Sequence, residues 1–179
     1  MTDQAFARGL IAELGKKTGV SWIRYAPATG SGQATTHAVW HLWYDDALCL
    51  VSGGDEQPLP GIEDVDRVEV VMRSKENGGR LVTWVGEVSV VRPEDELWEP
   101  VTSALVADRL NLDDLATAAK GWADGSVVTR IVPTGEILES PGDLDDAAHL
   151  QAPQPTPATT RGLLPRVLHR RKKRRPHLS

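Results

Sequence analysis

Two histidines are the residues whose type and spacing first suggest a metal site. His37 and His41 lie four residues apart in the segment Thr36-His-Ala-Val-Trp-His-Leu-Trp-Tyr44. On a β-strand, residues i and i+4 share a face but stand roughly 13 Å apart, which is too far for one ion. A helix would bring them together, but the β-branched and aromatic surroundings favour a strand. We therefore predict no metal site; a single histidine that lines a pocket or binds haem iron is the alternative.

A nucleophile is equally hard to assign from the sequence. Cys49 is the only cysteine, so an intrachain disulfide and a cysteine-based metal cluster are both excluded. Cys49 lies in the apolar run Ala47-Leu-Cys-Leu-Val51, which predicts a small buried hydrophobic residue. Gly30-Ser-Gly32 lacks the downstream glycine and helix of a phosphate-binding fingerprint. No catalytic acid, base or nucleophile stands out.

Strands must position most of these residues. The alternating or β-branched segments that predict strands are 20–26, 35–44, 47–52, 67–73, 80–91 and 126–132 with 136–138, the last pair being one strand or a hairpin. Asp45-Asp46 is a two-residue connection that predicts a hairpin, and Gly86 predicts a bulge or bend. A polar loop over 53–66 separates the third and fourth strands.

Helices are predicted at the N-terminus and before the last strand. Asp3 is a plausible N-cap of the first helix, and Gly15 or Gly19 would end it. Its apolar residues recur at helical spacing: Phe6, Leu10, Ile11 and Leu14. A second helix is predicted from Pro93, with Pro100 as either a kink or the true start, and a third over 112–120 with Asn111 as its cap.

The formal net charge of −5 is the sum of two unlike parts. All 25 acidic residues lie between Asp3 and Asp146, with 12 basic residues up to position 160, so this stretch carries 12 − 25 = −13. The other eight basic residues lie between Arg161 and Arg175, so this end carries +8. An acidic body repels phosphates, which argues against a nucleic-acid platform there. We predict a domain over 1–140, an acidic and then Pro/Thr-rich disordered linker over 141–160, and a basic disordered tail over 161–179.

The basic tail and the N-terminus bear on partners and compartment. Six consecutive cations, 170–175, could bind nucleic acid, an anionic membrane surface or the acidic body, or could only keep the chain in solution. The longest apolar runs are far shorter than the roughly 20 residues of a spanning helix. The N-terminus lacks the basic and apolar regions of a secretory signal, so we expect a cytoplasmic protein.

In this order of elements the chain resembles the pyridoxamine 5′-phosphate oxidase-like split β-barrel superfamily. Four segments carry the resemblance: 36–44, 48–54, 82–98 and 127–133. It implies a mainly β fold with flanking helices: a six-stranded antiparallel split barrel with an N-terminal helix and a helical insertion before the last strand. It also implies a homodimer whose subunit interface binds flavin mononucleotide, a deazaflavin coenzyme or, less often, haem.

The resemblance places the cofactor phosphate on the loop after the third predicted strand. Ser52, Gly53 and Gly54 match it, because backbone N–H groups of a Gly-rich turn can approach a phosphate. With Trp40 they are the expected cofactor contacts. Asp55 and Glu56 stand where the superfamily has cations; Arg67, Arg73, Lys75 or Arg80 would have to supply the charge from neighbouring strands or turns.

Two functions follow. The first is a flavin- or deazaflavin-binding protein, an oxidoreductase acting by hydride transfer on a small molecule, with the chemistry supplied by the cofactor. The alternative is a cofactor-free dimeric interaction or regulatory protein whose basic tail anchors it to an anionic partner. The two carboxylates of the loop favour the alternative.

Overall fold

The computed structural model of the protein describes residues 2–28, 32–76, 78–109 and 117–144. These belong to one compact unit, Met1–Asp145. Most of the expected linker, all of the expected tail and the expected helix cap Asn111 lie outside the described residues. Within the part of the chain that is described, no helix is long and apolar enough to cross a membrane.

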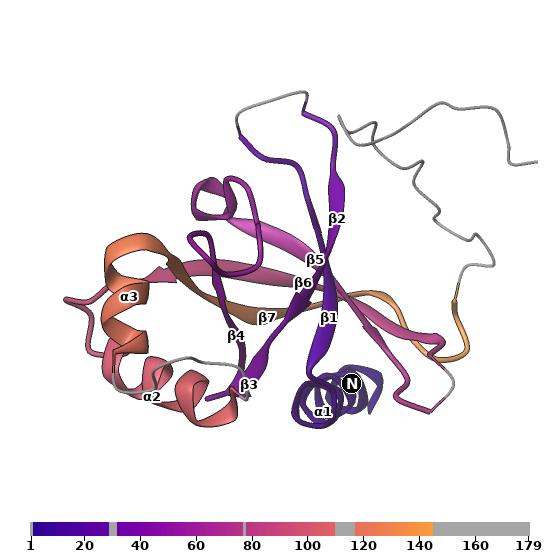
Figure 1. The fold of residues 1–179 in the computed structure, drawn as a ribbon. Coiled ribbons are helices and arrows are strands. Elements are labelled where there is room, and N and C mark those ends of the chain that lie inside the picture. Colours follow the sequence, from indigo (N-terminus) through magenta and orange to yellow (C-terminus); the bar gives the residue numbers. More distant parts are fainter. Residues whose placement is uncertain (1, 29–31, 77, 110–116, 145–179) are drawn as a thin grey trace, which may run out of the picture. The chain divides into compact units, whose positions relative to one another are not determined.

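Seven antiparallel strands form one curled sheet flanked by helices, so the mainly β fold class is confirmed (Figure 1). The elements in chain order are α1 (Thr2–Lys17), β1 (Val20–Tyr25), β2 (Thr35–Trp40), β3 (Leu42–Tyr44), β4 (Ala47–Ser52), the 3-10 turn η1 (Ile62–Asp64), β5 (Arg67–Arg73), β6 (Arg80–Val91), α2 (Trp98–Asp108), α3 (Ala118–Gly125) and β7 (Val127–Glu139). The strand order across the sheet is β2-β1-β5-β6-β7-β4-β3.

The strand expected over 35–44 is divided at His41, which gives seven strands where six were expected. Its first part, β2, pairs with β1, and its second part, β3, pairs with β4. β2 and β3 are therefore the two edges of the sheet, although one residue joins them. The sheet has to curl to bring these edges together, and this curl makes the fold barrel-like. The backbone N–H of His41 still donates to the Gly19 carbonyl at 3.1 Å, so the pairing with β1 extends to the break.

The concave side of the sheet holds the larger apolar core, to which every strand except β3 contributes at least one fully buried side chain. Gly86 sits where β6 must bend over this core. A Cβ atom there would come within 2.2 Å of Ile131 Cγ2 and 2.8 Å of the Trp84 ring. The register with β7 shifts between Trp84 and Gly86, which confirms the irregularity expected at this glycine.

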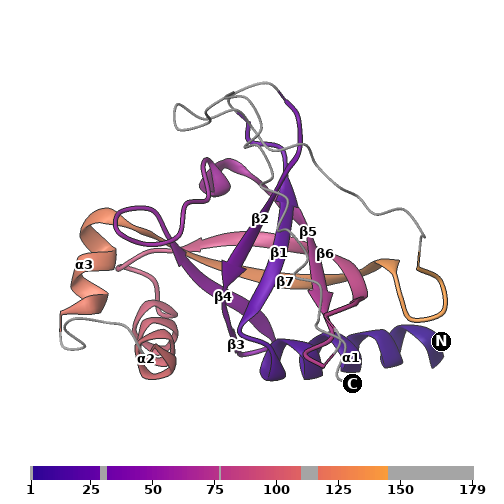
Figure 2. The ribbon, with the colours of Figure 1, turned by 45° about the vertical axis from the view of Figure 1, so that its right-hand side comes forward.

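Helix α1 packs across one end of the curled sheet (Figure 2). It buries Ile11 and Leu14 in the larger core. The helix begins at Thr2, so the expectation that Asp3 caps it is wrong: Asp3 lies in the first turn. Gly15 lies inside the helix and does not end it. Its lack of a side chain lets the Trp43 ring pack directly against its backbone.

Helices α2 and α3 pack together on the other side of β4 and β7 and form a second apolar core there (Figure 1). Helix α2 begins at Trp98, five residues after the start expected at Pro93, and Pro100 lies in its first turn, where a missing N–H costs little. Helix α3 covers Ala118–Gly125, and residues 112–116 of the helix expected over 112–120 lie outside the described residues. The last strand, β7, runs through Pro133 to Glu139 without a hairpin.

Two connections are held firmly. The hairpin expected at Asp45-Asp46 is confirmed: φ is +47° and +52° at the two residues, as a type I′ turn requires, and Arg130 donates to the backbone and side chain of Asp45. The loop over 53–66 is packed down, because Leu59 and Ile62 enter the larger core. This loop, which connects β4 to β5 along the chain, therefore covers part of the larger core.

Candidate functional site

The Ser52–Gly54 segment forms the turn that leaves β4. Ser52 is 1% exposed, and Gly53 and Gly54 have φ of +80° and +60°. The N–H of Gly53 donates to the carbonyl of Gln57 at 3.1 Å, so it is satisfied within the turn. A Cβ atom on Gly54 would come within 2.9 Å of the Gly125 carbonyl oxygen. Gly54 is therefore needed for a close contact with the end of α3, and the turn is closed against protein on this side.

Gln57 joins the turn to Trp40. Its side-chain oxygen accepts from the Trp40 backbone N–H at 2.7 Å, and its side-chain nitrogen donates to the carbonyls of Trp40 at 2.8 Å and Val51 at 3.1 Å. The structure therefore brings Trp40 close to Ser52–Gly54, two parts of the chain that sequence reasoning placed in one site. Gln57 itself was missed, because nothing in the pattern of the loop marks it.

A charged network covers the same corner of the molecule. Glu56 accepts hydrogen bonds from the guanidinium of Arg109 and, at 2.9 Å, from the indole N–H of Trp122. The side chains of Glu56 and Arg109 are only 11% and 21% exposed. The central carbon of Arg109 lies 4.9 Å from the centroid of the Trp40 ring. We call Trp40, Glu56, Arg109 and Trp122 the Glu56 network; it ties the turn after β4 to α2 and α3.

Solved structures with a similar fold come from several bacteria. The conserved hypothetical protein Rv2991 from Mycobacterium tuberculosis is 16% identical, with a TM-score of 0.54 over 70% of this chain and 79% of that one. The heme storage protein HutZ from Vibrio cholerae is 16% identical, with a TM-score of 0.52 over 71% and 89%. A proposed pyridoxamine 5′-phosphate oxidase from Listeria innocua is 19% identical, with a TM-score of 0.50 over 74% and 98%.

The chain has the pyridoxamine 5′-phosphate oxidase-like split-barrel fold. The fold that the sequence resemblance implies is thereby confirmed. No protein-family model and no curated protein matches the sequence. The function of this split barrel therefore has to be argued from its own side chains.

The turn after β4 does not fit a cofactor phosphate. Asp55 is exposed, and Glu56 is ion-paired with Arg109, so this cation at the turn already has a carboxylate. Of the other cations considered, Arg73 lies over the Trp22 ring at 4.8 Å and Arg80 pairs with Glu139 at 2.9 Å. A phosphate dianion placed here would meet two carboxylates and a neutralised guanidinium, which is unfavourable.

His37 and His41 are the two histidines among the described residues, and these residues hold no cluster of three or more His, Cys, Asp or Glu that could bind a metal ion. His37 Nε2 lies 2.8 Å from the Thr35 hydroxyl, and partial burial lowers its pKa. His41 is 1% exposed, and neither ring nitrogen has a hydrogen-bond partner of normal geometry. Burial lowers its pKa to about 4, against a smaller opposing effect of the Gly15 carbonyl. His41 cannot reach an external haem in this conformation.

Cys49 is the hydrophobic residue that the sequence predicts. It is fully buried in the second core, and burial raises the pKa of its thiol to about 11. The neighbouring Arg130 opposes this shift without cancelling it. A thiol with such a pKa is almost entirely protonated near neutral pH, so Cys49 is not a nucleophile.

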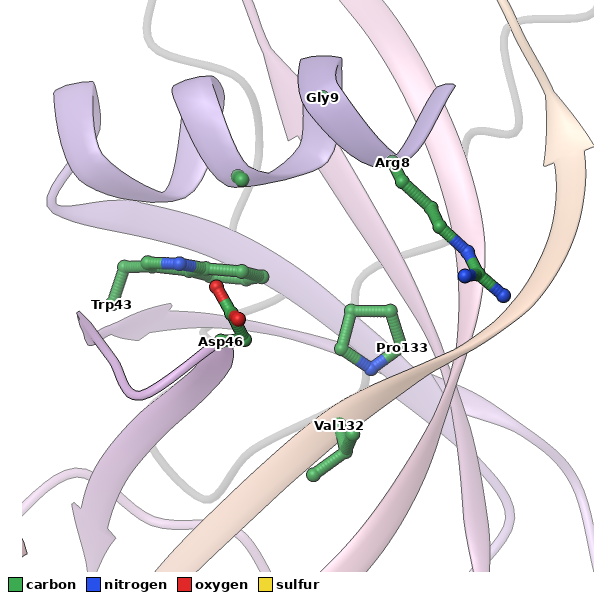
Figure 3. A pocket seen from close by; sticks show the side chains of 7 residues that line it. Arg8, Gly9, Trp43, Asp46, Val132 and Pro133 are labelled. Atoms are coloured by element: carbon green, nitrogen blue, oxygen red, sulfur yellow. The ribbon is translucent and has the colours of Figure 1, made fainter. Parts of the chain in front are cut away.

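An open pocket lies elsewhere on the split barrel, between α1, the β3–β4 hairpin and β7 (Figure 3). Its volume is about 430 Å³, within the usual range for small-molecule sites. The lining residues are Arg8, Gly9, Ala12, Trp43, Asp46, Val132 and Pro133. None of the cofactor contacts expected from the sequence lines it.

Proposed function

We propose that this protein is a split-barrel binding protein that does not hold a flavin phosphate on the turn after β4. The observation that supports this is the position of Glu56 between Arg109 and the Trp122 indole N–H. These are the groups that would otherwise be free to bind an anion at this corner. A carboxylate of the protein itself uses both of them, so the corner is built for stability and not for a phosphate.

A cofactor-binding oxidoreductase is the second candidate, and the likeness of the fold favours it. HutZ is described as a heme storage protein, and the Listeria innocua protein as a proposed pyridoxamine 5′-phosphate oxidase. If a flavin, a deazaflavin or haem binds to this chain, the cofactor supplies the redox chemistry and the protein orients it. Of the expected contacts, Ser52 is buried, whereas Trp40 and Gly53 are partly exposed and Gly54 is exposed.

Spectroscopic titration separates the two candidates. Full-length protein would be titrated with flavin mononucleotide, a deazaflavin coenzyme and haemin while the visible spectrum and cofactor fluorescence are followed. Our proposal predicts no saturable change for the two flavins up to about 1 mM, which corresponds to about 4 kcal/mol of binding. A stoichiometric flavin complex at micromolar concentration that the two variants below place at the turn would overturn it.

Two variants show where any flavin binds. Glu56→Ala removes the internal carboxylate, and Arg109→Gln removes the cation. If the turn were the flavin site, Glu56→Ala would tighten flavin binding and Arg109→Gln would weaken it. Flavin binding that neither substitution changes would place the cofactor on another surface and would still leave the turn without a phosphate.

We also propose that the binding protein is a homodimer, as the resemblance to the split-barrel superfamily implies. Exposed apolar side chains support this: Val20 and Leu138 are each 44% exposed and offer apolar surface that a second subunit would cover. Sedimentation equilibrium of the full-length protein tests it, with a mass of two chains as the expected result. A single-chain mass of 19.5 kDa at all concentrations up to about 100 µM would contradict it. A dissociation constant above this concentration corresponds to a binding free energy weaker than about 6 kcal/mol.

A further inference from the structure

The pocket between α1, the β3–β4 hairpin and β7 has the features of a ligand site (Figure 3). Its walls are apolar: the Trp43 ring on one side, with Val132 and Pro133 of β7 opposite. Arg8 and Asp46 bring a cation and an anion to it from different elements. An apolar pocket with a few polar groups at its edge is the usual form of a small-molecule site.

Besides Arg8, helix α1 presents only small residues to the pocket. Gly9 and Ala12 form its roof and leave the space below them open. A Cβ atom on Gly9 would meet no atom within 4 Å, so the space beside this residue is open. A larger side chain at position 9 would therefore extend into free volume without disturbing the helix.

The aromatic wall is held rigidly. The Trp43 ring packs on α1 at Gly15, where a Cβ atom would come within 2.3 Å of the ring. Asp45 and Asp46 form the tight turn of the same hairpin, with Arg130 bonded to Asp45. Ring and turn are thus fixed relative to the helix, and a preformed pocket loses little binding energy to ordering.

Two charged side chains lie at the pocket. Among the described residues, the side chains of Arg8 and Asp46 take part in no ion pair. The guanidinium of Arg8 lies against Gly135, where a Cβ atom would come within 2.9 Å of it. The missing side chain at Gly135 thus lets the Arg8 head group lie along β7 beside Pro133, as Figure 3 shows.

We propose that this pocket binds a small organic acid with a flat apolar body that carries a hydrogen-bond donor away from its acidic group. Arg8 would pair with the acid, Trp43 and Pro133 would contact the flat body, and Asp46 would accept from the donor. A diacid is disfavoured, because its second charge would meet the Asp46 carboxylate. This inference is independent of whether the turn after β4 binds a flavin.

The probe for the test is 2-anilinonaphthalene-6-sulfonate, which carries its anionic group and its N–H donor at opposite ends of a flat naphthalene and whose fluorescence rises in apolar surroundings. Full-length protein should give a saturable rise with one dye per chain. The variant Gly9→Leu, which fills the pocket, should weaken binding at least about tenfold, as loss of an apolar contact of about 1.4 kcal/mol would do. Near-ultraviolet circular dichroism confirms that each variant is folded.

Gly121→Leu is the matched control. Gly121 is also a helix glycine, in α3, and a Cβ atom on it would likewise meet nothing within 4 Å. It does not line the pocket, so this variant should bind the dye as the unmodified protein does. An equal loss in both variants, or no saturable dye binding up to about 1 mM, would overturn the proposal.

Competition defines the ligand class. 4-Aminobenzoate should displace the dye, and 4-aminobenzamide, which has the same shape without the charge, should need a concentration about three- to tenfold higher because it lacks the charge-assisted hydrogen bond. In Arg8→Gln this difference should disappear. Equal competition by the two compounds in the unmodified protein would show that Arg8 does not select an acid.

Discussion

The guanidinium of Arg109 lies over the indole ring of Trp40, with its central carbon 4.9 Å from the ring centroid. Trp40 ends β2, and Arg109 directly follows α2, so this contact joins the wall of the split barrel to the helical insertion. Glu56 holds the same guanidinium from the turn after β4. Because both partners of the ion pair are mostly buried, losing one of them costs more than the loss of a surface pair.

Glu56→Gln should therefore lower the free energy of unfolding by about 1–2 kcal/mol, because Arg109 loses its counter-charge in a partly buried place. Urea denaturation measures it. Asp55→Asn is the matched control: Asp55 is the neighbouring carboxylate and is exposed, so its effect should stay within about 0.5 kcal/mol. Equal effects of the two substitutions would show that the ion pair does not hold the insertion.

The strands were predictable because their signal is local. Alternation of apolar and polar residues marks β5, and the two aspartates of the β3–β4 turn mark a hairpin whatever the rest of the chain does. The break at His41 was not predictable, because β2 and β3 separate only when their partners β1 and β4 lie at opposite ends of the sheet. Nothing in the segment itself interrupts the strand pattern.

The site was predictable only in part, for the same reason. The sequence grouped Trp40 with Ser52–Gly54 as cofactor contacts, and in the structure Gln57 is hydrogen-bonded to both Trp40 and Gly53. That these residues bind a cofactor stays a prediction. The sequence also showed the two carboxylates of the turn. It did not show the partner of Glu56, because Arg109 is 53 residues away along the chain. A contact over such a separation follows from the fold, and no local pattern encodes it.

Two glycines of α1 should respond in opposite ways to alanine. Gly9→Ala should raise the free energy of unfolding by up to about 1 kcal/mol, because alanine is the better helix former and its methyl group meets open space. Gly15→Ala should lower it by about 1–3 kcal/mol, because its methyl group would overlap the Trp43 ring. Thermal and urea unfolding of both variants measure the difference. A stabilised Gly15→Ala protein would show that α1 is not seated on Trp43.

The basic end of the chain should act as an anchor that the acidic body opposes. Full-length protein is expected to bind vesicles containing about 30% anionic lipid at low salt, since each cation at such a surface contributes about 1 kcal/mol. Removing residues 151–179 takes away eight cations and should abolish this binding in a cosedimentation assay. A full-length variant with the six consecutive cations 170–175 changed to glutamine controls for length. Vesicle binding that survives both changes would rule out the anchor.

His41 should make the split barrel sensitive to acid. Its pKa is about 4 in the folded protein, and we take it as its ordinary value of 6.5 in the unfolded chain. Between these values the unfolded state binds more protons, so the stability due to the neutral buried ring is complete above pH 6.5 and is lost as pH falls through 4. The loss should amount to about 3 kcal/mol.

Urea denaturation between about pH 7 and 4 measures this loss of stability, and His41→Gln should remove the part of the decline that is due to His41. His37→Gln should remove a smaller part, because His37 is only partly buried. If His41→Gln loses stability with pH as steeply as the unmodified protein, His41 is not the group that titrates.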